Sequence, residues 1–142
     1  MAGKTLNELE VGQTAERMHT VTEQDIQAFA DVSGDHNPVH LDAAFAATTQ
    51  FKGRIAHGML SGAYISAVIA GDLPGPGSIY ISQTMNFRRP VRIDDTVVTR
   101  VEITAIDQEK ARVTLKTSCS VKDKHVVEGE AVVMVPRAEQ SA

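Results

Sequence analysis

The chain has 142 residues, 42% of them hydrophobic, which is enough apolar side chain for one compact domain with its own core. Its 14 basic and 18 acidic residues give a formal net charge of −4 without a dense basic cluster, so we expect no nucleic-acid partner. No segment approaches the roughly 20 apolar residues that span a bilayer, and residues 1–10 lack the apolar core of a secretory signal. We expect a single domain over residues 1–142, with an ordered core over about 5–136, located in the cytoplasm and not in a membrane.

The chain begins with the pattern of a strand followed by a helix. Residues 14–21 alternate between polar and apolar side chains, which predicts a strand. Thr22 and Asp25 have the spacing of a capping box. We therefore expect a helix that begins after Thr22 and ends at Gly34.

Two further helices are expected. Asp42 is placed to cap a short one that runs to about Thr48. Residues 58–73 are apolar or small on nearly every face, which is the pattern of a helix buried on all sides, and the Pro-Gly-Pro-Gly run at 74–77 ends it. Its many small residues allow other backbone to approach closely, as a helix wrapped by a sheet requires.

Four alternating segments follow, and each predicts a half-buried antiparallel strand. They cover residues 79–87, 96–106, 111–122 and 125–135. The polar connectors between the last three are short enough for hairpins, so these strands are expected to pair as neighbours. Cys119, the single cysteine, falls within an alternating segment and is expected in the core. Together the elements predict an α+β fold with a curved antiparallel sheet around the long helix.

The run Val-Ser-Gly-Asp-His-Asn-Pro-Val-His that ends at His40 carries the strongest functional signal. Gly34 permits an unusual backbone conformation and Pro38 restricts the residue before it, so Asp35 and His40 are expected on irregular chain. A tight turn can aim both side chains into one cavity, where a carboxylate and an imidazole can hold one water and divide the base and acid roles. A purely structural alternative is that Asp35 and Asn37 form turn hydrogen bonds and His40 packs beside them.

This run resembles the signature of the R-specific enoyl-CoA hydratases, also called hydratase 2 or MaoC-like dehydratases, which is Ser-Gly-Asp-x-Asn-Pro-x-His followed by a small-residue helix. Every defined position matches, from Ser33 to His40. The similarity continues through residues 41–46, 55–60 and 77–80, covers most of the chain, and is close to the short bacterial PhaJ-type members. It implies the hot-dog fold and a homodimer formed by continuing one sheet into its twin.

The resemblance also implies an activity, the reversible syn addition of water to a trans-2-enoyl-CoA to give an (R)-3-hydroxyacyl-CoA. The coenzyme A thioester is then the substrate, and no separate cofactor is expected. Asp35 takes the role of general base and His40 that of general acid, although the two roles are exchangeable. Asn37 is expected to hold the turn or to support the pair. The sequence presents no tetrahedral set of metal ligands, so we expect no metal.

Negative charge that develops on the thioester oxygen needs a hydrogen-bond donor. Gly58 lies at the expected start of the long helix, where free N–H groups and the positive end of the helix dipole favour negative charge. The residues alone support a packing role for Gly58 equally well, and the resemblance favours the oxygen-binding role. By the same resemblance, Ser66 is expected to orient the catalytic carboxylate. His57 either faces the cleft or caps and packs at the helix start.

Other residues carry weaker signals. Cations that could anchor the phosphates of coenzyme A are Lys52, Arg54, Arg88, Arg89 and Arg92. Residues that could line or back an acyl tunnel are Met59, Leu60, Tyr64 and Ile65. We expect the remaining histidines to lie on strands or at the surface; they are His19, His36 and His125.

Two other functions remain compatible with the sequence. A hot-dog thioesterase also places a thioester at a helix N-terminus, and the fold alone does not choose the chemistry. A non-catalytic acyl-CoA-binding subunit would have the same periodicity but no need for an intact Asp35 and His40. The sequence does not indicate the acyl-chain length, nor whether the product enters polyhydroxyalkanoate synthesis or fatty-acid metabolism.

Overall fold

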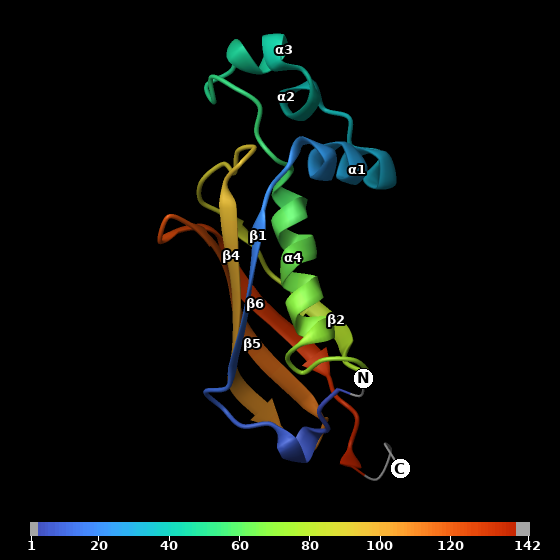
Figure 1. Cartoon of the computed structure of the whole chain (residues 1–142). Helices are drawn as coiled ribbons and strands as arrows, with labels where there is room; N and C mark the ends of the chain where they lie inside the picture. The colour runs from blue at the N-terminus through green and yellow to red at the C-terminus, as the bar shows by residue number, and fades with distance from the viewer. Residues whose placement is uncertain (1–2, 139–142) are drawn as a thin grey trace.

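The structure is a computed structural model that describes residues 3–138. It consists of a group of short helices at one end, a long helix and an antiparallel sheet along that helix (Figure 1). The helices are η1 (Leu6–Glu8), α1 (Glu23–Ser33), α2 (Pro38–Leu41), α3 (Ala43–Ala47) and α4 (Gly58–Gly71). Figure 1 shows α1, α2 and α3 together beyond the first turn of α4, while both chain ends lie at the opposite end of the molecule. The helical end therefore contains the predicted motif and the start of the long helix.

The strands form one antiparallel sheet in the order β1-β4-β5-β6-β2, with β3 beside β6. They are β1 (Thr14–Thr20), β2 (Ile79–Gln83), β3 (Asn86–Phe87), β4 (Thr96–Asp107), β5 (Arg112–Val121) and β6 (Lys124–Met134). The neighbour pairing of β4, β5 and β6 confirms the prediction from their short connectors. The predicted strand at 79–87 is instead two strands. The pairing is interrupted where the Thr84 carbonyl comes so close to Gly129 that a side chain there would collide with it.

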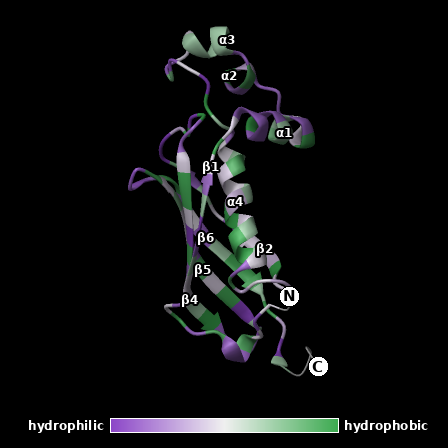
Figure 2. Ribbon diagram, in the orientation of Figure 1, coloured by the Kyte–Doolittle hydropathy of each residue, from purple (hydrophilic) through white to green (hydrophobic). Residues whose placement is uncertain are grey.

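Helix α4 packs one face against the sheet. Its Ile65, Val68 and Ile69 are buried against apolar residues of the strands, and each such side chain contributes about 1.5–3 kcal/mol on burial. Figure 2 shows no continuous hydrophilic stripe along α4. Ala63 and Ala67 are nevertheless exposed, so the predicted burial on all sides is not found in the single chain. The arrangement is otherwise the α+β hot-dog fold that was expected, with its sheet along the central helix.

Two further expectations concern the core and the membrane. Cys119 is fully buried in the described structure, as its alternating position predicted, and its Sγ lies 3.4 Å from Thr99 Oγ1. Burial raises the pKa of this thiol above its ordinary value. Within residues 3–138, no helix has both the length and the apolar character needed to cross a bilayer.

Candidate active site

The turn that holds Asp35 is built from local hydrogen bonds. Helix α1 ends at Ser33, and its C-cap residue Gly34 adopts a left-handed conformation with φ 81°. The Asp35 N–H donates to Ser33 Oγ at 3.1 Å, and the Asn37 N–H donates to Asp35 Oδ1 at 3.2 Å. These are the turn contacts of the structural alternative, and they also fix the direction of the Asp35 carboxylate. The same side chain therefore closes the turn and presents a second oxygen outside it.

His40 does not lie on irregular chain, and this prediction is corrected by the structure. Pro38 is the first residue of the short helix α2, and Asn37 caps that helix by accepting from the Val39 N–H at 3.2 Å. Proline is well suited to the first helical position because the N–H that it lacks would have no intrahelical partner there. The Asn37 side chain thus has the structural role that was expected as one of its two alternatives.

The structure brings Asp35 and His40 together and adds His57 to them. One ligand atom from each of the three side chains lies within 4.8 Å of the other two. His40 and His57 are buried, with 8% and 2% of their surface exposed, whereas Asp35 is exposed. The two imidazole rings stack with their centroids 3.9 Å apart and an angle of 30° between the rings. From its sequence position alone, contact of His57 with both members of the pair was not expected.

Hydrogen bonds to main-chain carbonyls fix which nitrogen of each ring carries a proton. His40 Nδ1 lies 2.8 Å from the Ile55 carbonyl, and His57 Nε2 lies 2.9 Å from the Asp35 carbonyl. Because a carbonyl oxygen only accepts, both of these ring nitrogens must donate. In the neutral His40 ring, Nε2 therefore has a free lone pair. His57 also connects the Asp35 main chain to the His40 ring, so it contacts both halves of the pair.

The cluster of one carboxylate and two imidazoles contains metal-ligating atom types, which the sequence did not lead us to expect. Imidazole lone pairs lie in the plane of the ring, so two histidines that share an ion point their rings toward it. The stacked rings of His40 and His57 do not converge in this way. We interpret the cluster as a proton-transfer site.

The surroundings of His40 favour its neutral form. Burial is the largest effect and lowers the pKa of His40 below its ordinary value, and the neighbouring His57 acts in the same direction. The hydrogen bond to Ile55 and the charge of Asp35 oppose this shift without reversing it. At neutral pH the site therefore holds an imidazole that can accept a proton on Nε2.

Gly58 and His40 line the same cavity, which has a volume of about 290 Å³. Gly58 is the first residue of α4, so its N–H has no acceptor within the helix, and its N-cap residue His57 provides no side-chain cap. A Cβ at Gly58 would lie 2.7 Å from the ring of Phe87, which also lines the cavity. Gly58 therefore combines an available donor with close packing, so the two roles weighed for it are compatible.

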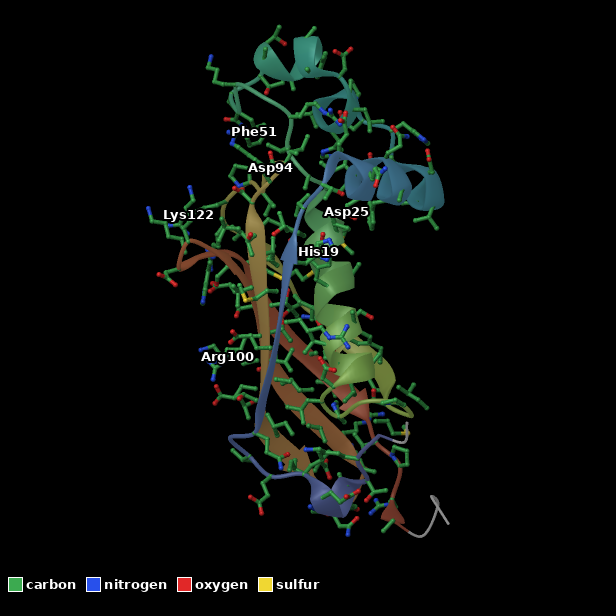
Figure 3. All side chains as sticks on the ribbon, viewed as in Figure 1. His19, Asp25, Phe51, Asp94, Arg100 and Lys122 are labelled. Atoms are coloured by element: carbon green, nitrogen blue, oxygen red, sulfur yellow. The ribbon has the colours of Figure 1, made fainter. Side chains whose placement is uncertain are left out.

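Two other expectations concern residues near the cavity. Met59, Leu60, Tyr64 and Ile65 do not line it, and its apolar wall is formed instead by residues that include Phe51, Phe87, Val91 and Val127. Phe51 follows α3 at the helical end of the molecule in Figure 3. Ser66 lies eight residues beyond Gly58, about 12 Å along the helix at 1.5 Å per residue, and within the described residues it makes no hydrogen bond to Asp35. Its orienting role stays a prediction.

The cations proposed as phosphate anchors have different surroundings. Arg88 and Arg89 line the cavity, where Arg88 pairs with Glu128 and Arg89 donates to a main-chain carbonyl. Arg92 donates to the Phe51 carbonyl at 2.6 Å. Arg54 lies largely within the protein and bonds the His40 carbonyl, which does not suit a phosphate anchor.

The remaining histidines lie outside the cavity, on strands or the surface as expected. His19 on β1 pairs with Asp25 at 2.8 Å, and Figure 3 shows both beside α4. His36 and His125 are exposed and pair with Asp31 and Glu128. A larger hollow of about 520 Å³ includes His125 and Arg100 but none of Asp35, His40 or Gly58.

Comparison with known proteins agrees with this geometry. A family model described as the MaoC like domain matches residues 5–129. The (R)-specific enoyl-CoA hydratase of Rhodospirillum rubrum is 51% identical over 129 residues, which is 91% of this chain and 90% of the relative. The 3-hydroxybutyryl-CoA dehydratase of Methylorubrum extorquens is 48% identical over 134 residues, covering 94% and 85% of the two chains.

A solved structure extends the comparison to three dimensions. The unliganded R-hydratase PhaJ1 from Pseudomonas aeruginosa superposes with a TM-score of 0.90 at 54% identity, covering 95% of this chain and 87% of that one. The similarity in sequence and the similarity in fold thus both extend over most of the two chains. On this evidence the chain belongs to the MaoC-like domain family.

Proposed function

We propose that this protein is an R-specific enoyl-CoA hydratase, which adds water reversibly to a trans-2-enoyl-CoA and forms an (R)-3-hydroxyacyl-CoA. One observation carries the proposal: Asp35 and His40 approach each other beside a cavity whose wall includes the first residue of a long helix. The similarity to an (R)-specific enoyl-CoA hydratase and to a 3-hydroxybutyryl-CoA dehydratase supports it, because these names describe the two directions of one reaction type.

The reaction begins with a water held between the Asp35 carboxylate and His40 Nε2. Neutral His40 takes one proton from this water while the water oxygen bonds to the β-carbon, and Asp35 accepts a hydrogen bond from the other proton. The sequence suggested Asp35 as base and His40 as acid. The tautomer and the lowered pKa of His40 favour the exchanged role in this first step, because together they leave a neutral imidazole whose free Nε2 can accept a proton.

The electron pair of the double bond moves toward the thioester oxygen, where the Gly58 N–H stabilises the enolate. Collapse of the enolate takes the proton back from the His40 imidazolium onto the α-carbon. The water has then added in full, with its hydroxyl on the β-carbon and its proton on the α-carbon, and the protonation of the pair is restored. Because one water and one pair of side chains serve both carbons, the addition is syn.

The proposal is tested by following the absorbance of the conjugated thioester of crotonyl-CoA and hexenoyl-CoA with purified protein. We expect a decrease in absorbance and, by chiral analysis, the (R)-3-hydroxyacyl-CoA. Cleavage of the thioester would also lower this absorbance, so release of free coenzyme A thiol without formation of the (R)-3-hydroxyacyl-CoA would indicate the thioesterase instead. Tight acyl-CoA binding with neither reaction would indicate the non-catalytic binding subunit.

We propose in addition that two copies form a homodimer through β2 and the exposed face of α4. The strand β2 lies at an edge of the sheet, and its Ile79 and Ile81 expose 58% and 41% of their surface, while Met59 at the start of α4 exposes 53%. An edge strand with exposed apolar side chains is suited to pairing with another strand.

We expect light scattering to give a mass of about twice the 15.3 kDa of one chain. The variant Ile81→Lys places a charge on the edge strand and is expected to shift the population toward monomer. The matched variant Val11→Lys, at an exposed apolar residue before β1, is expected to leave the mass unchanged. A wild-type protein that is monomeric at all concentrations would contradict the dimer.

A further inference from the structure

The main chain of His40 lies at the end of a helix with only four residues. The C-cap residue Asp42 closes α2 by bonding Pro38, so the His40 carbonyl has no donor within the helix. Arg54 supplies one, because its Nε donates to this carbonyl at 2.7 Å. Only 15% of the Arg54 side chain is exposed. The contact is therefore shielded from water and links two segments that are distant in the sequence.

The residue after Arg54, Ile55, bonds the imidazole ring of His40. The Ile55 carbonyl accepts from His40 Nδ1 at 2.8 Å, and the Ile55 N–H donates to the Val39 carbonyl at 3.3 Å. The segment 54–55 thus contacts both the main chain and the ring of His40. If the main chain of His40 shifts, the bond to Ile55 is strained and Nε2 changes its direction relative to the cavity.

The guanidinium of Arg54 makes a second, separate contact. Its Nη1 lies 2.7 Å from Glu23 Oε1 at the start of α1, and the Glu23 side chain is 70% exposed. An ion pair in such an exposed position contributes little to the stability of the fold. The exposed contact can therefore be removed alone, by a substitution of Glu23, whereas a substitution of Arg54 removes both contacts.

We propose that Arg54 is a positioning residue of the active site, whose guanidinium holds the main chain of His40 so that Nε2 faces the substrate cavity. Arg54 does not line the cavity and acts through His40 alone. Arginine suits this position because its planar fork bonds the His40 carbonyl and Glu23 in two fixed directions, which a lysine ammonium cannot reproduce. The kinetic consequence of this role rests on the proposed hydratase function, but the structural consequence does not.

The kinetic test compares three variants. Arg54→Met removes both contacts, Arg54→Lys keeps the charge but not the fork, and Glu23→Gln removes the exposed ion pair only. We expect the two Arg54 variants to lower kcat for crotonyl-CoA hydration by about 10- to 100-fold with KM within about twofold, since small displacements of a catalytic group cost this much. Glu23→Gln is expected to keep both constants within about twofold. Circular dichroism checks that each variant is folded. If Arg54→Met does not fold, the comparison of Arg54→Lys with Glu23→Gln still tests the proposal.

A second readout needs no substrate. The pKa of the His40 imidazole is measured by NMR on labelled protein, with the His40→Gln spectrum identifying its signal. The charged groups that face this ring are Asp35 and His57, and neither is altered by the variants. Burial is the largest effect on the pKa of His40 and lowers it, and it outweighs the bond to Ile55, which raises it. Loss of the Arg54 contact exposes the ring to water, so we expect the pKa of His40 to rise toward the ordinary value, in Arg54→Lys as well, where the positive charge is kept.

The outcomes separate the two proposals. Wild-type kcat and an unchanged His40 pKa in both Arg54 variants would overturn the positioning role. An equal loss in Glu23→Gln would also overturn it, because the ion pair to α1 would then be the contact that matters. If the wild-type protein does not hydrate enoyl-CoA, the hydratase function fails, and the NMR measurement still decides the role of Arg54.

Discussion

Replacing Asp35 by asparagine or His40 by glutamine is expected to lower kcat for enoyl-CoA hydration by two to four orders of magnitude, with little change in KM. General acid–base catalysis by a positioned side chain contributes about 10²- to 10⁴-fold, and each substitution leaves an uncharged polar side chain that cannot exchange a proton in this way. Initial rates of crotonyl-CoA hydration measure the effect. Because the two side chains act on one water, the double variant is expected to lose little more than either single variant.

The matched control for this pair is His36→Gln. His36 belongs to the same turn but is exposed and lies 3.4 Å from Asp31, outside the cavity. The same change of side chain is therefore expected to leave kcat unaltered. Full activity in both Asp35→Asn and His40→Gln would show that the mechanism proposed for this site is wrong.

Replacing Gly58 by alanine is expected to lower kcat/KM by about 10²-fold, in the range found when one donor to a developing oxyanion is lost. The N–H remains in this variant, but the new methyl group occupies the space through which a thioester carbonyl must approach it. The same methyl group would lie 2.7 Å from the Phe87 ring, which is 55% exposed and able to move. We therefore expect a larger loss of activity than of stability, measured by steady-state kinetics and thermal unfolding.

Two control variants separate these effects. Gly62→Ala adds a methyl group to the same helix, where it would meet the flexible Met85 side chain at 3.1 Å, and it is expected to retain most of the activity. Phe87→Ala in the Gly58→Ala background is expected to restore the melting temperature without restoring kcat/KM. Wild-type kcat/KM in Gly58→Ala would exclude the proposed position of the thioester oxygen at the helix start.

The predictions that succeeded rest on local sequence patterns. The capping box of Thr22 and Asp25, the left-handed Gly34 and the hairpins of the last three strands are found where they were expected. Each depends on residues a few positions apart, whose preferences are already present in the chain. The helix α2 was missed because the Asn37-Pro38 pair fits both a helix start and an irregular turn. The strand over 79–87 was predicted as continuous, whereas its pairing is interrupted beside Gly129, a residue distant in the sequence.

The candidate site also combines features set by the local sequence with features set by residues outside the motif. The motif placed Asp35 and His40 in one turn, and the structure brings the two side chains together there. The contacts that set the chemistry of this pair come from outside the motif. Ile55 fixes the tautomer of His40, and His57 stacks on its ring. His57 was visible only as a histidine before a helix, and Arg54 only as one cation among several.

The sequence by itself determined which groups are available for the reaction and where most of the helices, strands and turns lie, because these depend on side-chain chemistry and on neighbours along the chain. Only the tertiary structure decided that His40 is neutral with a free Nε2, that Arg54 and Ile55 hold it from both ends, and that the start of α4 shares its cavity. Burial and hydrogen bonds between segments 14 to 22 residues apart produce these properties, and they exist only once the chain has folded.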